Sequence, residues 1–377
     1  MKDLILLGAT GSIGTQTFDA IKNSEYQISV ISVGHNIKRT IEIIERYNIK
    51  YVTTIEEDDS LYIKSLYPNI KVGFGLDGIK YALEHYDGDV VNAITGIAGL
   101  KPTVIALKNN KNIYLANKET LVVAGEIIFS EARKRNLKIV PVDSEHNAIY
   151  QLLDKVNRRD VKSLIITASG GAFRDKTRDE LEDVKAVDAL NHPNWNMGSK
   201  ITVDCASMVN KGLEVMEAHF LFDMPYDKIR TVIHKESIIH SMVEFNDGSV
   251  RALMYNPSMV IPIQNAIFGD NHKSIVPDID FVKIGTLSFR EMDYERFPMI
   301  ALAYKCGMKG GFYPTVFNAS NEKAVELFLQ GKIKFLEIEN IIKKAIQNFD
   351  NEKEELEYNI DNILYLDKKV KDSIEVN

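Results

Sequence analysis

Residues 4–14 read LILLGATGSIG, a short apolar run followed at once by three glycines in G-x-x-G-x-x-G spacing. The run Leu4–Leu7 is typical of a strand buried on both faces in a parallel sheet, and Thr15–Lys22 can follow as a helix. Glycines between a strand and a helix let the backbone approach a pyrophosphate held at the helix amino terminus. The stretch predicts a dinucleotide-binding turn, although its spacing differs from the G-x-G-x-x-G fingerprint. A glycine-rich turn without a ligand is the alternative.

Downstream of this turn the sequence alternates between short β-rich runs and helical stretches such as Gly78–His85 and Thr103–Lys108. Further strands are predicted at Ile28–Val33, Tyr51–Ile55, Val72–Gly75, Val90–Thr95 and Ile113–Ala116. Regular alternation of this kind predicts a doubly wound α/β sheet.

The end of the second predicted strand bears on cofactor choice. An NAD-binding fold usually places Asp or Glu there to hold the ribose 2′-hydroxyl, but this chain has Gly34-His35-Asn36. His35, Lys38 and Arg39 could instead surround a 2′-phosphate, which favours NADP. If Lys38 and Arg39 are only the solvated start of the next helix, cofactor choice stays open.

Two carboxylates lie in residues 141–151, PVDSEHNAIYQ, where the β-rich run Leu137–Val142 ends. Strand side chains alternate, so Asp143 and Glu145 are expected to point the same way at the carboxyl end of a strand. Oxygen ligands suit a hard divalent cation such as Mg²⁺ or Mn²⁺, and Glu214 in NKGLE is the candidate third ligand. The alternative is a D-x-E pair that only solvates a strand end.

Asn117-Lys118-Glu119 stands at the predicted carboxyl edge of the sheet, before a predicted helix Thr120–Arg135. Ligands bind at this edge in open α/β folds. Charges on the surface at a helix start are an equally good interpretation of Lys118 and Glu119.

A predicted strand Ser163–Thr167 leads into ASGGAF, residues 168–173, a small-residue turn that can present hydroxyl and N–H groups to an anion. A predicted helix Thr177–Leu190 precedes HPNWNMG, residues 192–198, which contains the only tryptophan of the chain. One large aromatic in such a loop suits a lid that excludes water. Packing of Trp195 against its own domain is the alternative.

Asn210 and Lys211 precede Glu214 within one turn of a predicted helix that continues to Phe222. An amide, an ammonium and a carboxylate at this spacing could bind phosphate and metal side by side. Lys211 as a solvated helix charge is the competing interpretation.

The segment Thr231–Tyr255 alternates like antiparallel strands, with a hairpin turn at residues 246–248. His234 and His240 would share one face of a regular strand, where packing or interface roles are expected. From about residue 298 the pattern is helical, at Val316–Gln330, Phe335–Phe349 and Ile360–Val370. We expect an NADPH-binding domain at 1–142, an α+β catalytic and dimerisation domain at 143–285 with a lid at about 169–199, and a small helical domain at 286–377.

Composition limits the classes of function. The 377 residues are 45% hydrophobic, enough for packed cores, and the net charge of -7 argues against nucleic acid as a partner. Two cysteines favour a reducing compartment. The initial apolar run is too short for a signal peptide, and no stretch approaches the roughly 20 apolar residues of a membrane span. A soluble cytoplasmic protein without membrane contact is expected.

The motifs GATGSIG, ANKET, PVDSEHNAIYQ, TASGGAF, HPNWNMG and VNKGLE, in this order, closely resemble those of the 1-deoxy-D-xylulose 5-phosphate reductoisomerase family over essentially the whole chain. The resemblance implies rearrangement of 1-deoxy-D-xylulose 5-phosphate to an aldehyde, then hydride reduction to 2-C-methyl-D-erythritol 4-phosphate in the non-mevalonate isoprenoid pathway. It also implies NADPH, a divalent metal (magnesium or manganese, with cobalt as a further option) and a homodimer.

The resemblance also implies site residues. It makes Asp143, Glu145 and Glu214 the metal ligands and places Lys118 and His192 with them among the catalytic residues. It assigns to NADPH Thr10, Gly11, Ser12, Ile13, Gly34, His35, Asn36, Asn117, Glu119 and Gly198. It assigns to the substrate Ser144, Glu145, Ser169, His192, Trp195, Cys205, Asn210, Lys211 and Glu214.

Two positions depart from the family pattern. Cys205 replaces a serine that helps to bind the substrate phosphate, and a thiol is the weaker hydrogen-bond donor. His35 replaces a lysine, which leaves the 2′-phosphate with a partner that is only partly charged at neutral pH. Alternative functions are a semialdehyde-type NADP-dependent dehydrogenase, which needs a nucleophilic cysteine, and a non-catalytic NADP sensor.

Overall fold

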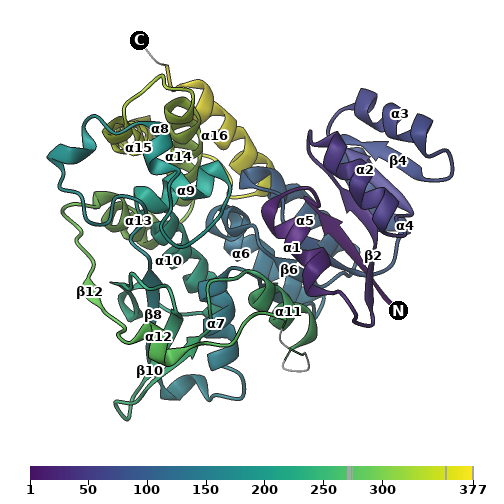
Figure 1. The fold of residues 1–377 in the computed structure, drawn as a ribbon. Coiled ribbons are helices and arrows are strands. Elements are labelled where there is room, and N and C mark those ends of the chain that lie inside the picture. Colours follow the sequence, from purple (N-terminus) through teal and green to yellow (C-terminus); the bar gives the residue numbers. More distant parts are fainter. Residues whose placement is uncertain (270–272, 274, 353–354, 376–377) are drawn as a thin grey trace. The chain divides into compact units, whose positions relative to one another are not determined.

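The structure is a computed structural model that describes residues 1–269, 273, 275–352 and 355–375 (Figure 1). The chain forms two compact units. The first consists of Met1–Thr120, Glu126–Asn147 and Ser258–Pro277, and the second of Leu121–Gly125, Ala148–Pro257 and Asp278–Asn377. The segment Ser258–Pro277, expected in the middle domain, thus belongs to the first unit. The functional division into three domains stays a prediction.

The first unit is built on a parallel sheet, which in the described residues has seven strands in the order β4-β3-β2-β1-β5-β6-β7. The strands are β1 (Lys2–Leu7), β2 (Tyr26–Ser32), β3 (Tyr51–Thr54), β4 (Lys71–Phe74), β5 (Asp89–Asn92), β6 (Ile113–Leu115) and β7 (Ile139–Pro141). The strand order reverses between β1 and β5, and ligands of doubly wound sheets bind at the carboxyl ends of the strands at such a point.

The central strand of this sheet behaves as predicted. All four side chains from Leu4 to Leu7 are fully buried, because helices cover both faces of a parallel sheet. The helices of this unit are α1 (Ser12–Ala20), α2 (Ile37–Arg46), α3 (Glu57–Leu66), α4 (Gly75–His85), α5 (Leu100–Lys108), α6 (Lys118–Lys134) and α11 (Val260–Phe268). Residues 121–125 of α6 are grouped with the second unit.

Helix α11 explains why a late segment returns to the first unit. It packs against α1, where the buried Gln264 donates a hydrogen bond from Nε2 to the Ala20 carbonyl at 3.0 Å. Ile263 and Ile267 join the apolar core that also contains Phe18. Helix α11 therefore stabilises α1, the helix that follows the glycine-rich turn.

The second unit contains a mixed sheet, with the described strands in the order β11-β10-β8-β9-β12. The strands are β8 (Val161–Ala168), β9 (Ile229–Ile233), β10 (Ile239–Phe245), β11 (Val250–Met254) and β12 (Arg290–Glu291). The predicted hairpin joins β10 to β11, with Gly248 at φ +84°. The expectation of antiparallel strands throughout Thr231–Tyr255 holds only in part for β9, which pairs antiparallel with β12 but in parallel with β8. A helical crossover between β8 and β9 permits this pairing.

Helices make up the rest of the second unit. They are α7 (Ser144–Leu152, whose first residues belong to the first unit), α8 (Ala186–Ala189), α9 (Ser199–Ala206), α10 (Val209–Phe222), α12 (Phe281–Ile284), α13 (Pro298–Lys309), α14 (Tyr313–Leu329), α15 (Phe335–Glu352) and α16 (Ile360–Asp372). The last three confirm the helical carboxyl-terminal pattern, and α14 packs against both α15 and α16 (olive to yellow in Figure 1). Within the described residues, no helix combines the length and apolar character that crossing a membrane requires.

The predicted helix Thr177–Leu190 is wrong. Only a 3₁₀ turn at Asp179–Leu181 and the four-residue α8 form there. Arg178 binds both carboxylate oxygens of Glu339, at 2.8 and 2.5 Å, and also the Arg296 carbonyl. These contacts tie the start of the segment to residues 118 and 161 positions further along the chain, so tertiary structure overrides local propensity.

Candidate functional site

The glycine-rich turn of the first unit has no room for side chains at two of its three glycines. A Cβ on Gly8 would lie 2.6 Å from the Ala93 carbonyl oxygen, and Gly8 has φ +86°. A Cβ on Gly14 would lie 2.3 Å from the Gly8 oxygen. Gly11 caps α1 without a side-chain hydrogen bond, and the first turn carries no acidic residue. This helix start can therefore present N–H groups to an anion.

The residues after β2 form the second part of the proposed cofactor site. Asn36 caps α2, since its Oδ1 accepts a hydrogen bond from the Arg39 N–H at 3.0 Å. His35 and Lys38 are exposed there, whereas the Arg39 guanidinium pairs with Glu42 at 2.6 Å. His35 and Lys38 are thus the more available partners for a 2′-phosphate.

Asn117 is a structural residue as well as a proposed cofactor contact. Its Nδ2 donates to the carbonyls of Ile94 and Gly96 at 2.6 and 2.7 Å, and its Oδ1 accepts from the Thr120 N–H at 3.0 Å. Both the nitrogen and the oxygen of this buried side-chain amide are therefore hydrogen-bonded to backbone groups. A contact from Asn117 to a dinucleotide would come from its backbone.

Asp143 follows β7 and forms an ion pair with Lys118, and both side chains are less than one-tenth exposed. His146 Nδ1 lies 3.6 Å from Asp143 Oδ1. Burial alone would raise the pKa of Asp143, but the Lys118 ammonium and His146 hold that pKa well below its usual range. The carboxylate is thus ionised at neutral pH, as a metal ligand must be.

The predicted geometry of Asp143 and Glu145 needs correction. Strand β7 ends at Pro141 and helix α7 begins at Ser144, so Glu145 lies in a helical turn and not on a strand. A strand-to-helix turn relates the two, since the Glu145 N–H donates to Asp143 Oδ1 at 3.4 Å. The Ser144 hydroxyl donates to Glu145 Oε2 at 2.6 Å. His146 was not among the predicted site residues, because the i,i+3 spacing that brings it to Asp143 applies to a helix start and not to the strand end that was expected.

In the second unit, the start of α10 gathers three proposed site residues. Glu214 is only 1% exposed, accepts a hydrogen bond from Asn210 Nδ2 at 2.5 Å, and forms an ion pair with Lys211. Lys211 Nζ also donates to the Thr167 carbonyl at 2.6 Å, at the end of β8. Lys211 is buried, so its interpretation as a solvated helix charge was wrong.

The turn after β8 brings further proposed substrate residues together. Gly170 and Gly171 have φ of +89° and +65°, and a Cβ on Gly171 would lie 2.4 Å from the Cys205 carbonyl oxygen. The Gly171 N–H donates to Ser169 Oγ at 3.2 Å, and His192 Nε2 lies 2.9 Å from the same hydroxyl. Ser169, His192, Cys205 and Lys211 thus surround the carboxyl end of β8.

Trp195 packs within the second unit. Its ring meets His240 edge to face at 6.0 Å between centroids, and His240 stacks on Tyr255 at 3.6 Å. His234 follows β9 whereas His240 lies in β10, so the two histidines do not share a strand face as expected. Both pack inside the unit, as expected for structural histidines.

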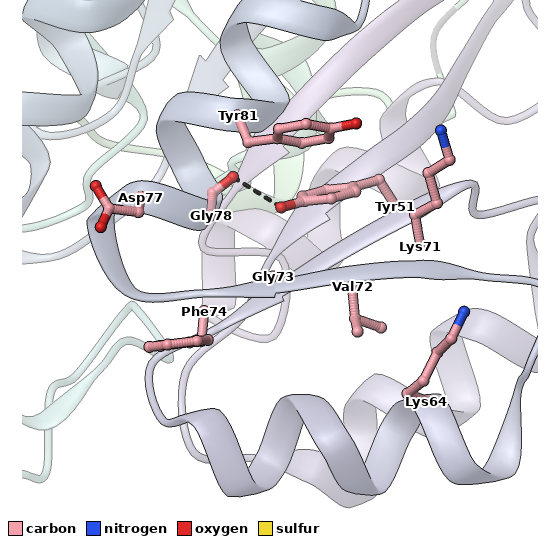
Figure 2. Close-up of a pocket in the computed structure, with 9 residues that line it drawn as sticks. All are labelled: Tyr51, Lys64, Lys71, Val72, Gly73, Phe74, Asp77, Gly78 and Tyr81. Carbon is pink, nitrogen blue, oxygen red and sulfur yellow. Dashed lines mark hydrogen bonds between the residues drawn. The ribbon is translucent and has the colours of Figure 1, made fainter.

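Figure 2 shows a separate pocket of about 450 Å³ in the first unit, at the edge strand β4. It is lined by Tyr51, Lys64, Lys71, Val72, Gly73, Phe74, Asp77, Gly78 and Tyr81. Lys64 Nζ donates to the carbonyls of Pro68 and Ile70, and Tyr51 donates to the Gly78 carbonyl at 3.0 Å. Burial raises the pKa of Tyr51 to about 12. Because these polar groups serve the fold and none is a predicted site residue, the pocket is not part of the candidate site.

Comparison with known proteins covers most of the chain. Residues 4–125 match the sequence profile described as 1-deoxy-D-xylulose 5-phosphate reductoisomerase, residues 139–222 that of its C-terminal domain, and residues 254–373 the DXP reductoisomerase C-terminal domain. The 1-deoxy-D-xylulose 5-phosphate reductoisomerase of Lysinibacillus sphaericus is 48% identical over 93% of each chain. That of Clostridium botulinum is 45% identical, covering 99% of this chain and 98% of its own.

Solved structures agree in fold. A DOX-P reductoisomerase crystallised with NADPH, fosmidomycin and magnesium superposes with a TM-score of 0.92 at 34% identity, over 99% of this chain and 97% of that chain. The Zymomonas mobilis reductoisomerase in complex with NADPH gives 0.90 at 36% identity, over 98% and 97%. With these profile matches and relatives 45% to 48% identical over most of its length, the chain belongs to the 1-deoxy-D-xylulose 5-phosphate reductoisomerase family.

Proposed function

We propose that this chain converts 1-deoxy-D-xylulose 5-phosphate to 2-C-methyl-D-erythritol 4-phosphate with NADPH and a divalent metal, in the non-mevalonate isoprenoid pathway. The observation that carries the proposal is the pair of buried carboxylates, Asp143 and Glu214, each with a lysine partner. They occur in a chain 34% identical to a reductoisomerase that holds NADPH, fosmidomycin and magnesium. The three functional regions proposed are 1–142 for NADPH, 143–285 for metal and substrate, and 286–377 as a helical brace.

The proposed metal ligands are Asp143, Glu145 and Glu214. Their donors are all carboxylate oxygens, which suit Mg²⁺ or Mn²⁺, and the lowered pKa of Asp143 keeps one of them ionised. When bound, a divalent cation would polarise the carbonyl and hydroxyl oxygens of a ketose and fix their orientation. The buried Lys118 ammonium beside Asp143 can donate a hydrogen bond to a substrate oxygen near the reacting carbon.

The proposed phosphate site lies at the end of β8. There the Ser169 hydroxyl, the Asn210 amide and the Lys211 ammonium supply neutral and charged donors. His192 contacts Ser169, and Trp195 would exclude water from the reacting centre. The remaining proposed substrate contacts are Ser144 and Cys205, and the proposed NADPH contacts are Thr10, Gly11, Ser12, Ile13, Gly34, His35, Asn36, Asn117, Glu119 and Gly198.

Product analysis tests the proposed reaction. Purified protein incubated with 1-deoxy-D-xylulose 5-phosphate, NADPH and Mg²⁺ should form 2-C-methyl-D-erythritol 4-phosphate, one molecule for each NADPH oxidised, as measured by NMR and absorbance. NADPH oxidation that yields a different product would contradict the proposed substrate chemistry.

Cys205 gives a prediction about substrate affinity. We expect Cys205→Ser to lower the KM for the ketose phosphate by roughly fivefold, because a hydroxyl donates a stronger hydrogen bond to phosphate than a thiol does. Initial rates at saturating NADPH measure this KM. An unchanged KM would mean that Cys205 makes no contact with the phosphate.

His35 gives a prediction about cofactor choice. We expect His35→Lys to lower the KM for NADPH by roughly fivefold and to leave the KM for NADH unchanged, because a full positive charge at this exposed position favours a 2′-phosphate. Rates with both cofactors provide the comparison. Equal changes for NADPH and NADH would exclude contact with the 2′-phosphate.

The alternative functions have less support. A semialdehyde-type dehydrogenase needs a reactive thiol, but Cys306 is buried, and this burial raises its pKa to about 12. If Cys205 were the nucleophile of such an enzyme, alkylation would abolish activity with an aldehyde and phosphate as substrates. A non-catalytic NADP sensor would bind NADPH without any metal-dependent turnover.

We also propose a homodimer. Strand β11 lies at the edge of its sheet with Val250 half exposed, and such an edge can pair with a second copy. Light scattering should then give twice the 42.6-kDa chain mass, whereas a single-chain mass would contradict this. The cytoplasm as location, and manganese or cobalt as further metals, remain predictions from the sequence.

A further inference from the structure

The loop of residues 191–198 is tied to a distant turn by one side chain. Asn194 Nδ2 donates to the Lys235 carbonyl at 2.6 Å and to Ser237 Oγ at 2.8 Å. Both partners lie in the connection between β9 and β10, and all three residues belong to the second unit. Asn194 therefore joins the proposed lid to the sheet that supports the phosphate site.

The receiving turn is held rigidly by a buried histidine. His234 Nε2 accepts hydrogen bonds from the N–H groups of Ile238 and Ile239 at 3.2 and 3.1 Å. Its Nδ1 must then carry the proton, which it donates to the Ser288 carbonyl at 2.9 Å. Ser237 itself has φ +53°, a conformation that this network maintains. The β9–β10 turn is thus held in place by its own hydrogen bonds, and Asn194 attaches the loop to it.

Backbone N–H groups of the loop determine which ring nitrogen of His192 carries the proton. Its Nδ1 accepts hydrogen bonds from the N–H groups of Asn194 and Trp195 at 3.1 and 3.0 Å. The proton of the neutral ring therefore lies on Nε2, which donates to Ser169 Oγ at 2.9 Å. The Gly171 N–H donates to the same hydroxyl oxygen. With two donors on its oxygen, Ser169 directs its own proton elsewhere, as a donor to an anion.

We propose that Asn194 and Ser237 form a latch that keeps residues 192–195 in the arrangement that fixes the His192 tautomer and aims the Ser169 hydroxyl at the substrate phosphate. They are positioning residues, since they act through His192 and Ser169. The part of this inference that concerns phosphate rests on the proposed function. The part that concerns the loop does not.

The single tryptophan of the chain makes the latch directly measurable. Trp195 fluorescence and its quenching by acrylamide report on the loop without any substrate. We expect Asn194→Ala to raise the quenching constant by about twofold or more, because the loop loses its hydrogen bonds to the β9–β10 turn, while the contact of Trp195 with His240 remains. Asn194→Asp keeps the shape but lacks the donor, so it should behave like Asn194→Ala. Asn191→Ala, in the exposed start of the same loop, serves as the matched control and should match the unmodified protein.

Steady-state kinetics then test whether Asn194 and Ser237 position the loop for substrate binding. Loss of the two Asn194 hydrogen bonds should raise the KM for the ketose phosphate by roughly tenfold with kcat changed by less than about threefold, because bound substrate must now order the loop. Ser237→Ala should give a smaller effect, since the Lys235 carbonyl remains, and adding it to Asn194→Ala should change nothing further. Melting temperatures establish that each variant is folded.

Quenching and KM within twofold of the unmodified protein in both Asn194→Ala and Ser237→Ala would overturn the latch. Raised quenching with an unchanged KM would overturn its positioning role. If the unmodified protein has no turnover, the proposed function fails, while the quenching measurement still decides whether the latch exists.

Discussion

Replacement of Glu145 by glutamine is expected to reduce kcat by a factor on the order of 10² to 10³ at saturating NADPH and ketose phosphate. The amide has almost the same shape but lacks the charge that the proposed metal site requires. The Ser144 hydroxyl can still donate to the side-chain oxygen, so the start of α7 should stay folded. Steady-state rates over a range of Mg²⁺ concentrations, with NADPH affinity measured separately, provide the test.

The matched control is Glu131→Gln, which removes a carboxylate from the same unit. Glu131 lies on α6, pairs with Arg135 just beyond the end of this helix and belongs to no proposed site, so this variant should retain full activity. Glu145→Gln with the kcat and Mg²⁺ dependence of the unmodified protein would show that Glu145 is not a metal ligand.

Replacement of Gly14 by alanine is expected to weaken NADPH binding by roughly tenfold or more and to lower the free energy of unfolding by about 2 to 3 kcal/mol. The added Cβ would lie 2.3 Å from the Gly8 carbonyl oxygen and 2.7 Å from backbone atoms of Ala9. Backbone atoms cannot move aside as a flexible side chain can, so the turn itself must shift. Thermal melting and NADPH titration measure the two effects.

Gly75→Ala separates steric crowding from a general effect of losing a glycine. A Cβ on Gly75 meets no atom within 4 Å, although φ is +58°, so the expected loss is only about 1 kcal/mol. Its NADPH affinity should be unchanged. Gly14→Ala with normal NADPH affinity would place the dinucleotide elsewhere in the chain.

Local patterns were sufficient to predict the strand and the turn that begin the first unit. Leu4–Leu7 and the glycines after it specify a buried strand and a close turn by themselves, because both depend on adjacent residues. The hairpin at Gly248 could be predicted for the same reason. Helix α11 could not, since its place against α1 depends on contacts about 240 residues apart along the chain, such as that from Gln264 to Ala20.

For the candidate site, the residue types could be predicted from the sequence but their geometry could not. The types of residue that bind a hard metal or a phosphate could be read from Asp143, Glu145 and Lys211. Their geometry could not, because Glu145 lies in a helix start and Lys211 finds the Thr167 carbonyl across the fold. The attachment of Asn194 to Lys235 and Ser237 likewise exists only in three dimensions. The spacing of residues along the chain does not predict the contact of Lys211 with Thr167 or the contacts of Asn194 with Lys235 and Ser237.

The proposed reaction is tested most directly by following NADPH absorbance in the presence of 1-deoxy-D-xylulose 5-phosphate, with Mg²⁺ or Mn²⁺ compared with a chelator. An NADPH-dependent reductoisomerase should oxidise NADPH only when the ketose phosphate and the metal are both present, and the rate should fall to background with the chelator. Folded protein that binds NADPH but shows no turnover with any divalent metal would contradict the assignment.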